Sequence, residues 1–193
     1  MVKPTSDQDK RDRVLEGARE AFTRHGFRRV TMGDLAEAAG MSRPALYLVF
    51  PNKEEIFKAV LEEFAATALA EIREGLAGTD TTRDALHLAF DTWTVRPFEL
   101  LHHAAGYEEL SDCTHGFARE VVTTMYRDFE VLLVDILEPE KDGLSRRGLT
   151  TEHVARVLAV AVRGFKETAR DVDELRALIE GILTLTLAAG STD

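Results

Sequence analysis

The chain has 193 residues, of which 45% are hydrophobic and 30% charged, a composition typical of globular proteins in water. Its one cysteine, Cys113, excludes an internal disulfide, and its polar first ten residues lack the apolar core of a signal peptide. No apolar run reaches the ~18 to 20 residues that a membrane span requires. These features predict a cytoplasmic protein with no membrane partner.

The net charge of −10 argues against a nucleic-acid partner, but the charge is unevenly distributed. Residues 1–60 carry eleven cations and nine anions, a net charge of +2, which leaves −12 for residues 61–193. This asymmetry favours two functions on one chain, with a small N-terminal module that faces phosphates and an acidic body. Mildly positive stretches of this length are common, so charge alone leaves the question open.

Apolar residues recur at helical spacing almost throughout, and no strand alternation of useful length is present. We expect a disordered arm at residues 1–9, followed by a first helix that ends at Gly26. Two short helices then follow. Thr31 caps the first of them and Gly40 ends it, while Ser42 caps the second.

A long fourth helix is predicted from a capping box at Asn52 and Glu55, with an apolar face that continues to Ile72. Further helices are expected from residue 81, from 97, over 117–137, from 150 and over 171–187. The fold class is therefore all-α, with about nine helices.

The segment from Thr31 to Phe50, TMGDLAEAAGMSRPALYLVF, places two short helices on either side of a glycine turn, as in a helix-turn-helix. A recognition helix brings its N-terminal side chains to base edges, while its flanks contact phosphates. The candidate DNA contacts are Thr31, Ser42, Arg43, Pro44, Ala45, Tyr47 and Lys53. Arg43 suits a guanine or a phosphate. A helical hairpin with Tyr47 and Phe50 in its core has the same spacing, so the spacing leaves both interpretations open.

A longer pattern bears on this choice. The segment from about Lys10 to Leu69 resembles the DNA-binding domain of the TetR (tetracycline-repressor-like) family of bacterial transcriptional regulators. The resemblance rests on Val14-Leu15, Ala18, Phe22, Gly26-Phe27, Val30-Thr31, Leu35-Ala36, Ala39-Gly40, Ser42, Leu46-Tyr47, Phe50 and Lys53-Glu54-Glu55. A pattern this dense is far more specific than a lone motif.

The resemblance implies a three-helix DNA-binding head with a linking fourth helix at residues 10–70, and an effector-binding and dimerisation body at residues 71–193. It implies a homodimer on palindromic double-stranded DNA. We expect a repressor that a small, largely apolar effector releases from its operator.

The resemblance also assigns roles within the head. Positions equivalent to Thr31, Ser42, Tyr47 and Lys53 contact the DNA backbone in the family, and residues 43–45 read bases. The chain departs from the family at positions 48 and 49, where Leu and Val replace the usual His or aromatic residue, and at position 44, where Pro replaces Gly or Ala. We therefore expect its operator contacts beyond position 47 to differ.

The resemblance implies an effector pocket in the body, for which apolar pockets with a few polar groups are the usual form. The candidate lining residues are Phe90, Trp93, Phe98, His102, Tyr107, Phe117, Met125, Tyr126, Phe129 and Phe165. Any helical body needs such side chains in its core, so a core position is the alternative for each of them.

The last two predicted helices carry faces too apolar to remain in water, and we expect these faces to form the dimer interface. In the family, the last two helices pack with those of the partner into a four-helix bundle. The predicted interface residues are Val154, Leu158, Val162, Leu175, Leu178, Ile179, Ile182 and Leu183.

An alternative function is a metal-dependent or small-molecule enzyme. Its basis is a set of carboxylate–imidazole pairs with two further possible ligands: Asp84 with His87, Glu99 with His102, Asp112 with His115, His103 and Cys113. A di-iron bundle needs two Glu-x-x-His pairs and two more glutamates, and only one such pair is present. No Ser-His-Asp order, phosphate loop or dinucleotide fingerprint is visible, so we expect no metal, no cofactor and no catalysis.

Overall fold

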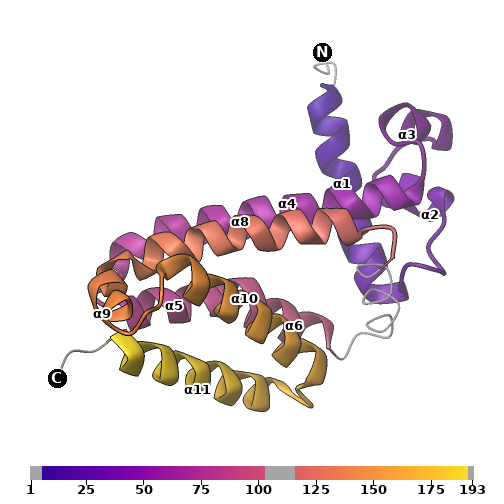
Figure 1. Ribbon diagram of the computed structural model, residues 1–193. Helices are drawn as coiled ribbons and strands as arrows, with labels where there is room; N and C mark the ends of the chain where they lie inside the picture. The colour runs from indigo at the N-terminus through magenta and orange to yellow at the C-terminus, as the bar shows by residue number, and fades with distance from the viewer. Residues whose placement is uncertain (1–5, 103–115, 191–193) are drawn as a thin grey trace. The chain divides into compact units, whose positions relative to one another are not determined.

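The computed structural model describes residues 6–102 and 116–190, and within these residues it contains helices and turns but no β-strand. The predicted all-α class is confirmed. The α-helices are α1 (Asp7–His25), α2 (Met32–Ala38), α3 (Arg43–Val49), α4 (Lys53–Gly75), α5 (Thr82–Phe90), α6 (Arg96–Leu101), α8 (Arg119–Leu137), α9 (Lys141–Arg146), α10 (Thr151–Thr168) and α11 (Val172–Gly190) (Figure 1). A π-helical turn, Asp91–Val95, joins α5 to α6. Within the described ranges, no helix is both long and apolar enough to span a bilayer.

Helix α1 begins earlier than predicted. The Ser6 hydroxyl accepts a hydrogen bond from the Asp9 N–H (3.0 Å), and the Asp9 carboxylate accepts one from the Ser6 N–H (2.9 Å). This capping box satisfies N–H groups that the first turn leaves free. Residues 7–9 are therefore helical, which corrects the prediction of a disordered arm to residue 9. Residues 1–5 lie outside the described residues.

The described residues divide into two compact units. The first unit holds residues 6–64 and 116–123, and the second unit holds residues 65–102 and 124–190. Helices α4 and α8 contribute residues to both. The boundary within α4 falls after residue 64, earlier than the predicted boundary at residue 70. The start of α8 also belongs to the first unit, which was not predicted.

Helices α1, α2, α3 and the start of α4 enclose the core of the first unit (Figure 1). Helix α1 approaches α2 closely at Gly17, where an added Cβ would lie 2.9 Å from the Cβ of Ala38. Gly40 has a φ of 63° and turns the chain from α2 into α3, a conformation that favours glycine. The helix-turn-helix expected over residues 31–50 is therefore present.

A cluster of phenylalanine rings completes this core. The ring of Phe117, from the segment that precedes α8, lies 5.1 Å from that of Phe27 and 5.7 Å from that of Phe57, measured between centroids. Phe27 and Phe57 also pack edge-to-face at 5.4 Å. Phe117 was predicted to line an effector pocket in the body. It lies instead at the surface of the first unit, where it is 37% exposed and its ring packs against those of Phe27 and Phe57.

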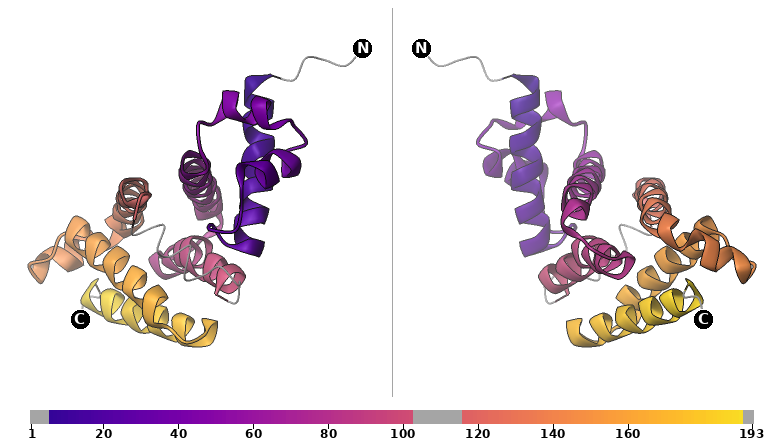
Figure 2. Two further views of the ribbon diagram at one scale, coloured as in Figure 1. Left: turned by 90° about the vertical axis from the view of Figure 1, so that its right-hand side faces the viewer. Right: turned by 90° about the vertical axis from the view of Figure 1, so that its left-hand side faces the viewer.

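In the second unit, α10 and α11 lie side by side (Figure 2). Most of the residues predicted to form the dimer interface are buried within this unit: Val154, Leu158, Val162, Leu175, Ile179 and Leu183. Leu178 and Ile182 are half-buried. The prediction of a dimer face was therefore wrong for the buried six, because the most strongly apolar stripe of each helix packs into the chain's own core.

A second, narrower apolar stripe remains on the solvent side of these helices. Val157 is 58% exposed and Val160 54% exposed on α10, and Leu185 is 69% exposed on α11. Gly164 and Gly181 also lie on exposed or half-exposed positions, and an added Cβ at either glycine would meet no atom within 4 Å.

Candidate nucleic-acid interface

Helix α3 is anchored to the first unit by one face. Leu46 is fully buried, Phe50 is buried just after the helix ends, and Val49 packs partly against the same core. At the other end, the Ser42 hydroxyl accepts a hydrogen bond from the Ala45 N–H (3.3 Å), which is the predicted N-cap. The opposite face of α3 is left in solvent.

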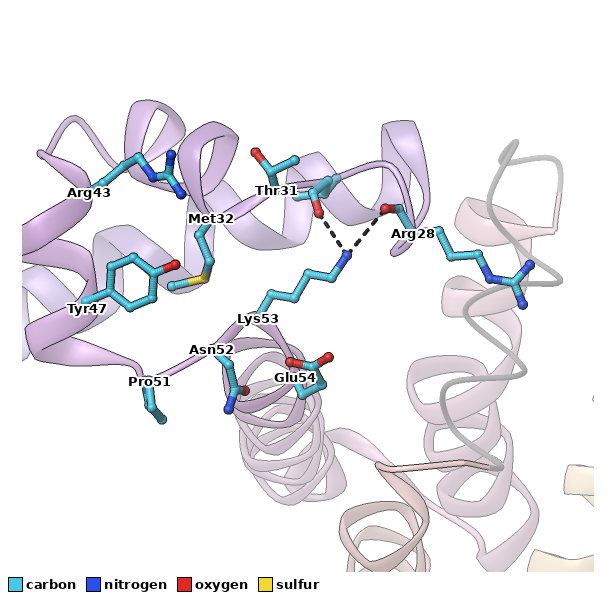
Figure 3. A pocket seen from close by; sticks show the side chains of 10 residues that line it. Arg28, Thr31, Met32, Arg43, Tyr47, Pro51, Asn52, Lys53 and Glu54 are labelled. Carbon is cyan, nitrogen blue, oxygen red and sulfur yellow. Dashed lines mark hydrogen bonds between the residues drawn. The ribbon is translucent and has the colours of Figure 1, made fainter.

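A shallow hollow of about 380 Å³ lies beside α3, between the loop that precedes α2 and the start of α4 (Figure 3). It is lined by Arg28, Val30, Thr31, Met32, Arg43, Tyr47, Pro51, Asn52, Lys53 and Glu54. Four of the predicted DNA contacts therefore meet around one concave surface. Arg28 and Met32 also line this surface, and neither was predicted as a DNA contact.

Arg43 and Tyr47 form the polar flank of α3 toward this hollow (Figure 3). They lie one turn apart and therefore share a side of the helix. Among the described residues, the Arg43 guanidinium and the Tyr47 hydroxyl have no hydrogen-bond or ion-pair partner. A guanidinium offers five donors in a planar fork, which suits phosphate oxygens or the O6 and N7 atoms of guanine.

Thr31 caps α2 as predicted, and both of its donors are engaged within the cap. Its N–H and its hydroxyl each donate to Oδ2 of Asp34 at 2.8 Å, and the hydroxyl oxygen accepts from the Asp34 N–H at 3.3 Å. These hydrogen bonds hold the pKa of Asp34 below its ordinary value. Thr31 therefore orients the start of α2, and it has no donor left for the expected phosphate contact in this conformation.

Lys53 is also engaged inside the protein. Its ammonium donates to the carbonyl oxygens of Phe27 (2.8 Å), Val30 (3.0 Å) and Arg28 (3.4 Å), and it lies 4.3 Å from the centroid of the Phe27 ring. Figure 3 shows the side chain reaching from the start of α4 to the loop between α1 and α2. An ammonium has three protons, and all three have acceptors here. In this structure Lys53 therefore holds the loop that precedes α2, and its phosphate contact stays a prediction.

Pro44 and Leu48 occupy the side of α3 opposite Leu46. Both are exposed, and Leu48 is the most exposed large apolar side chain of the described residues at 90%. Ala45 is half-buried. In the sequence, Leu48 is visible only as a departure from the family pattern. Its exposure depends on which face of α3 packs inward, so it could not be assigned as a contact from the sequence.

Comparison with known proteins places this head in a family. Residues 14–60 match the family model described as bacterial regulatory proteins, tetR family. The HTH-type transcriptional regulator TtgR of Pseudomonas putida is 31% identical over 126 residues, which cover 56% of this chain and 58% of TtgR. The HTH-type transcriptional regulator UidR of Escherichia coli is 26% identical over 196 residues, which cover 93% and 96% of the two chains.

A solved structure agrees with these relatives. SmeT, the repressor of the Stenotrophomonas maltophilia multidrug efflux pump SmeDEF, has 27% identity and a TM-score of 0.63, with 95% of this chain and 91% of SmeT covered. The head of this chain, residues 14–60, therefore matches the TetR family, and the chain as a whole is similar to transcriptional regulators. The TetR match at residues 14–60 includes all of α2 and α3, so the exposed face of α3 lies within the matched segment. The alignment with TtgR spans little more than half of that relative's length.

The predicted pocket residues that lie in the second unit are buried or half-buried: Phe90, Trp93, Phe98, His102, Met125, Tyr126, Phe129 and Phe165. Trp93 stacks on Phe129 with centroids 4.6 Å apart, and Phe90 meets Phe129 edge-to-face at 5.7 Å. These rings fill the core between α5 and α8. Tyr107 lies outside the described residues.

Two polar side chains of this unit, Tyr126 and Thr92, are half-buried and buried, respectively. Burial raises the pKa of Tyr126 to about 12, although the Arg163 guanidinium lies over its ring at 5.1 Å. In the π-helical turn, the buried Thr92 hydroxyl has no hydrogen-bond partner in the described structure. A buried hydroxyl without a partner is costly, and π-helical turns occur often at functional sites.

A second hollow, of about 250 Å³, lies between α5, the π-helical turn and α11. It is lined by His87, Phe90, Asp91, Val95, Arg176, Ile179 and Glu180. An ion pair crosses between the helices beside it, from Arg83 to Glu180 at 2.6 Å, and Nε2 of His87 lies 2.9 Å from the Glu180 carboxylate.

The carboxylate–imidazole pairs do not form a metal site in the described residues. Within residues 6–102 and 116–190, no group of three or more His, Cys, Asp or Glu side chains is placed to hold a metal ion. Asp84 accepts the Thr81 hydroxyl, His87 contacts α11, and Glu99 pairs with Arg176 at 3.4 Å. The Nε2 atom of His102 lies 3.0 Å from the carbonyl oxygen of Arg170. The other candidates, His103, Asp112, Cys113 and His115, lie outside the described residues.

Proposed function

We propose that this chain is a sequence-specific DNA-binding transcriptional regulator of the cytoplasm. In this proposal it is a homodimeric repressor, and a small, largely apolar effector lowers its affinity for a palindromic operator. The observation that carries the proposal is the flank of α3, where the Arg43 guanidinium and the Tyr47 hydroxyl face a hollow without protein partners among the described residues. The names of TtgR, UidR and SmeT as transcriptional regulators support it.

Selection of duplex fragments from a random library by the purified protein tests DNA binding directly. We expect a symmetric site, because a dimer places two recognition helices about 34–36 Å apart in successive major grooves. Arg43→Ala then separates two roles. A loss of about 1–3 kcal/mol confined to one base position assigns Arg43 to a base, whereas a uniform loss over all sequences assigns it to a phosphate. Failure to enrich any sequence would contradict the proposal.

The exposed stripe of α10 and α11 is the surface that we propose for the dimer. Val157, Val160 and Leu185 are large apolar side chains left in solvent, and the half-buried Leu178 and Ile182 lie beside Leu185 on α11. Gly164 and Gly181 support this choice. Glycine inside a helix costs roughly 1 kcal/mol of stability relative to alanine. The packing of the described unit does not require a glycine at either position, because an added Cβ would meet no atom within 4 Å. Small residues let a partner helix approach closely.

Sedimentation of Val160→Glu tests this surface, with Val131→Glu as the matched control. Val131 is an exposed valine of α8 (56% exposed), so its replacement adds the same charge away from the stripe. We expect Val160→Glu to shift the protein toward monomer at micromolar concentration and Val131→Glu to leave the dimer intact. A dimer that persists in Val160→Glu would place the interface elsewhere.

The core around Trp93 is where we propose that the effector binds. The buried Thr92 hydroxyl without a partner supports this, because a largely apolar ligand with one polar group would satisfy it. Trp93 is the only tryptophan of the chain, so its fluorescence reports on this region alone. We expect hydrophobic ligands that change this emission to release operator DNA over the same concentration range. Emission changes without release would contradict an effector role for the site.

A further inference from the structure

Helix α3 presents two different rows of side chains to solvent. The polar row is Arg43 and Tyr47, which line the hollow. The apolar row is Pro44 and Leu48, which lie one turn apart, directly opposite the buried Leu46. The apolar row is therefore the part of α3 that projects farthest from the core of the first unit.

The exposure of Leu48 is unusual for its surroundings. Its side chain is 90% exposed, and full burial of a leucine is worth about 1.5–3 kcal/mol. Leu48 contributes nothing comparable to the packing of its own unit, which Leu46 and Phe50 provide from the other face. Because folding of the chain does not bury Leu48, a partner that covers the apolar row would gain the hydrophobic free energy of that burial.

The charges beside the row restrict what that partner can be. The adjacent row carries the Arg43 guanidinium, which has no partner in the described structure. In the hollow beyond it, Lys53 is bonded to backbone carbonyl groups and Glu54 is anionic, so Arg43 is the cation that this side of α3 offers to a partner. A surface that matches both rows is therefore anionic where it meets Arg43 and apolar where it meets Leu48. The apolar row is only one side chain wide and one turn long, about 6 Å, which is too small for a protein core or a lipid surface.

The major groove of DNA has this combination. Phosphates line its edges, and the C5-methyl group of thymine is the apolar group that its base edges present. A helix fits within the groove, and about 6 Å along α3 corresponds to about two base steps of roughly 3.4 Å.

We propose that Leu48, with Pro44 beside it, reads thymine methyl groups in each half-site of the operator. This inference rests on the proposed function, and it assigns the apolar row to base recognition and the polar row to the flanking contacts. The departure of Leu48 from the family pattern then acts as a determinant of sequence preference, and the chain selects a thymine where an aromatic residue or histidine would make another contact.

Replacement of single thymines by deoxyuridine tests the proposal, because it removes only the C5-methyl group. The probes are variants of the site that the wild-type protein selects from a random duplex library. We expect one thymine in each half-site at which this change weakens wild-type binding about fourfold. Leu48→Ala should bind the thymine and deoxyuridine probes equally, while Leu48→Met, which keeps an apolar side chain of similar reach, should retain the difference.

The outcomes are distinct. If wild type discriminates at no thymine, or if Leu48→Ala discriminates as wild type does, the role of Leu48 is overturned while DNA binding stands. If no sequence is selected at all, the proposed function fails, and this inference with it. Since Leu48 is solvent-exposed, Leu48→Ala should unfold at the same temperature as wild type, which separates a lost contact from a lost fold.

Discussion

The two units orient their exposed helices in different ways. In the first unit, the short helices α2 and α3 are each fixed by specific side chains: Thr31 with Asp34 at one start, Ser42 at the other, and Lys53 on the loop that precedes α2. In the second unit, α10 and α11 are 18 and 19 residues long and bury continuous apolar stripes.

This difference follows from helix length. A seven-residue helix gains too little from its own hydrogen bonds and from burial to be stable alone, so caps and a cationic anchor decide its orientation. A helix of about five turns is oriented by the stripe that it buries. We therefore expect substitutions in the body to act through cavity formation, and substitutions in the head to act through single hydrogen bonds.

The largest effect is expected at Leu158 of α10. Leu158→Ala should reduce the free energy of unfolding by about 2–5 kcal/mol, since it leaves a cavity at a fully buried position. The control is Val131 of α8, which is 56% exposed and lies outside the stripe proposed for the dimer. Urea unfolding at one protein concentration measures both. Equal losses for Leu158→Ala and Val131→Ala would show that buried and exposed positions are not distinguished as the structure has them.

A smaller effect is expected at Lys53. Lys53→Met keeps the alkyl stem but removes the ammonium from three carbonyl groups, and hydrogen bonds to a charged group are worth about 1.5–3 kcal/mol. We expect lower thermal stability of the head and weaker DNA binding. The slope of log Kd against log salt concentration should stay unchanged, because a residue bonded inside the protein releases no counterion from DNA.

Lys58→Met is the matched control for Lys53→Met. Lys58 lies on the same helix and pairs with Glu55 across one turn, at a distance of 2.9 Å. Its removal should change thermal stability less than that of Lys53. If the slope of log Kd against log salt concentration is smaller by about 0.9 in Lys53→Met than in wild type, Lys53 contacts a phosphate of the DNA backbone.

The smallest effect is expected at the cap of α2. Thr31→Ala should cost about 1 kcal/mol of stability, while Thr31→Ser, which keeps the hydroxyl, should cost much less. Chemical unfolding at neutral pH measures both. Similar losses for the two variants would show that the methyl group, rather than the hydroxyl, carries the contribution of Thr31.

The same cap has a predicted pH dependence. Hydrogen bonds from Thr31 lower the pKa of Asp34 below 3.8, so the contribution of this carboxylate is complete above that pH and is lost as the pH falls through the lowered value. The stability difference between wild type and Thr31→Ala should therefore narrow in acid, where the hydroxyl no longer donates to a carboxylate, and the cap bond from the Asp34 N–H should account for what remains. A difference that does not change as the carboxylate is protonated would exclude the Asp34 carboxylate as a contributor.

The local signals in the sequence predicted most of the fold. The predicted caps Thr31, Ser42 and Asn52 each accept the backbone N–H three residues later. Thr81 and Asp171 do the same at the starts of α5 and α11. The capping box of Ser6 and Asp9 was overlooked although it has the same spacing. The π-helical turn at residues 91–95 carries no comparable signal, because it adds no cap or breaker to the helix that contains it.

The sequence by itself determined the helices, their caps and the helix-turn-helix, since these depend on residues within a few positions of one another. Only the tertiary structure decided which face of each helix is free. It buried Leu158 and exposed Val157, it directed the Lys53 ammonium to the carbonyl groups of a loop more than twenty residues away, and it placed Leu48 in solvent opposite Leu46. Apolar residues at a period of about 3.6 show that a helix has an apolar side. When a helix has two apolar stripes, the elements that pack against it decide which stripe is buried.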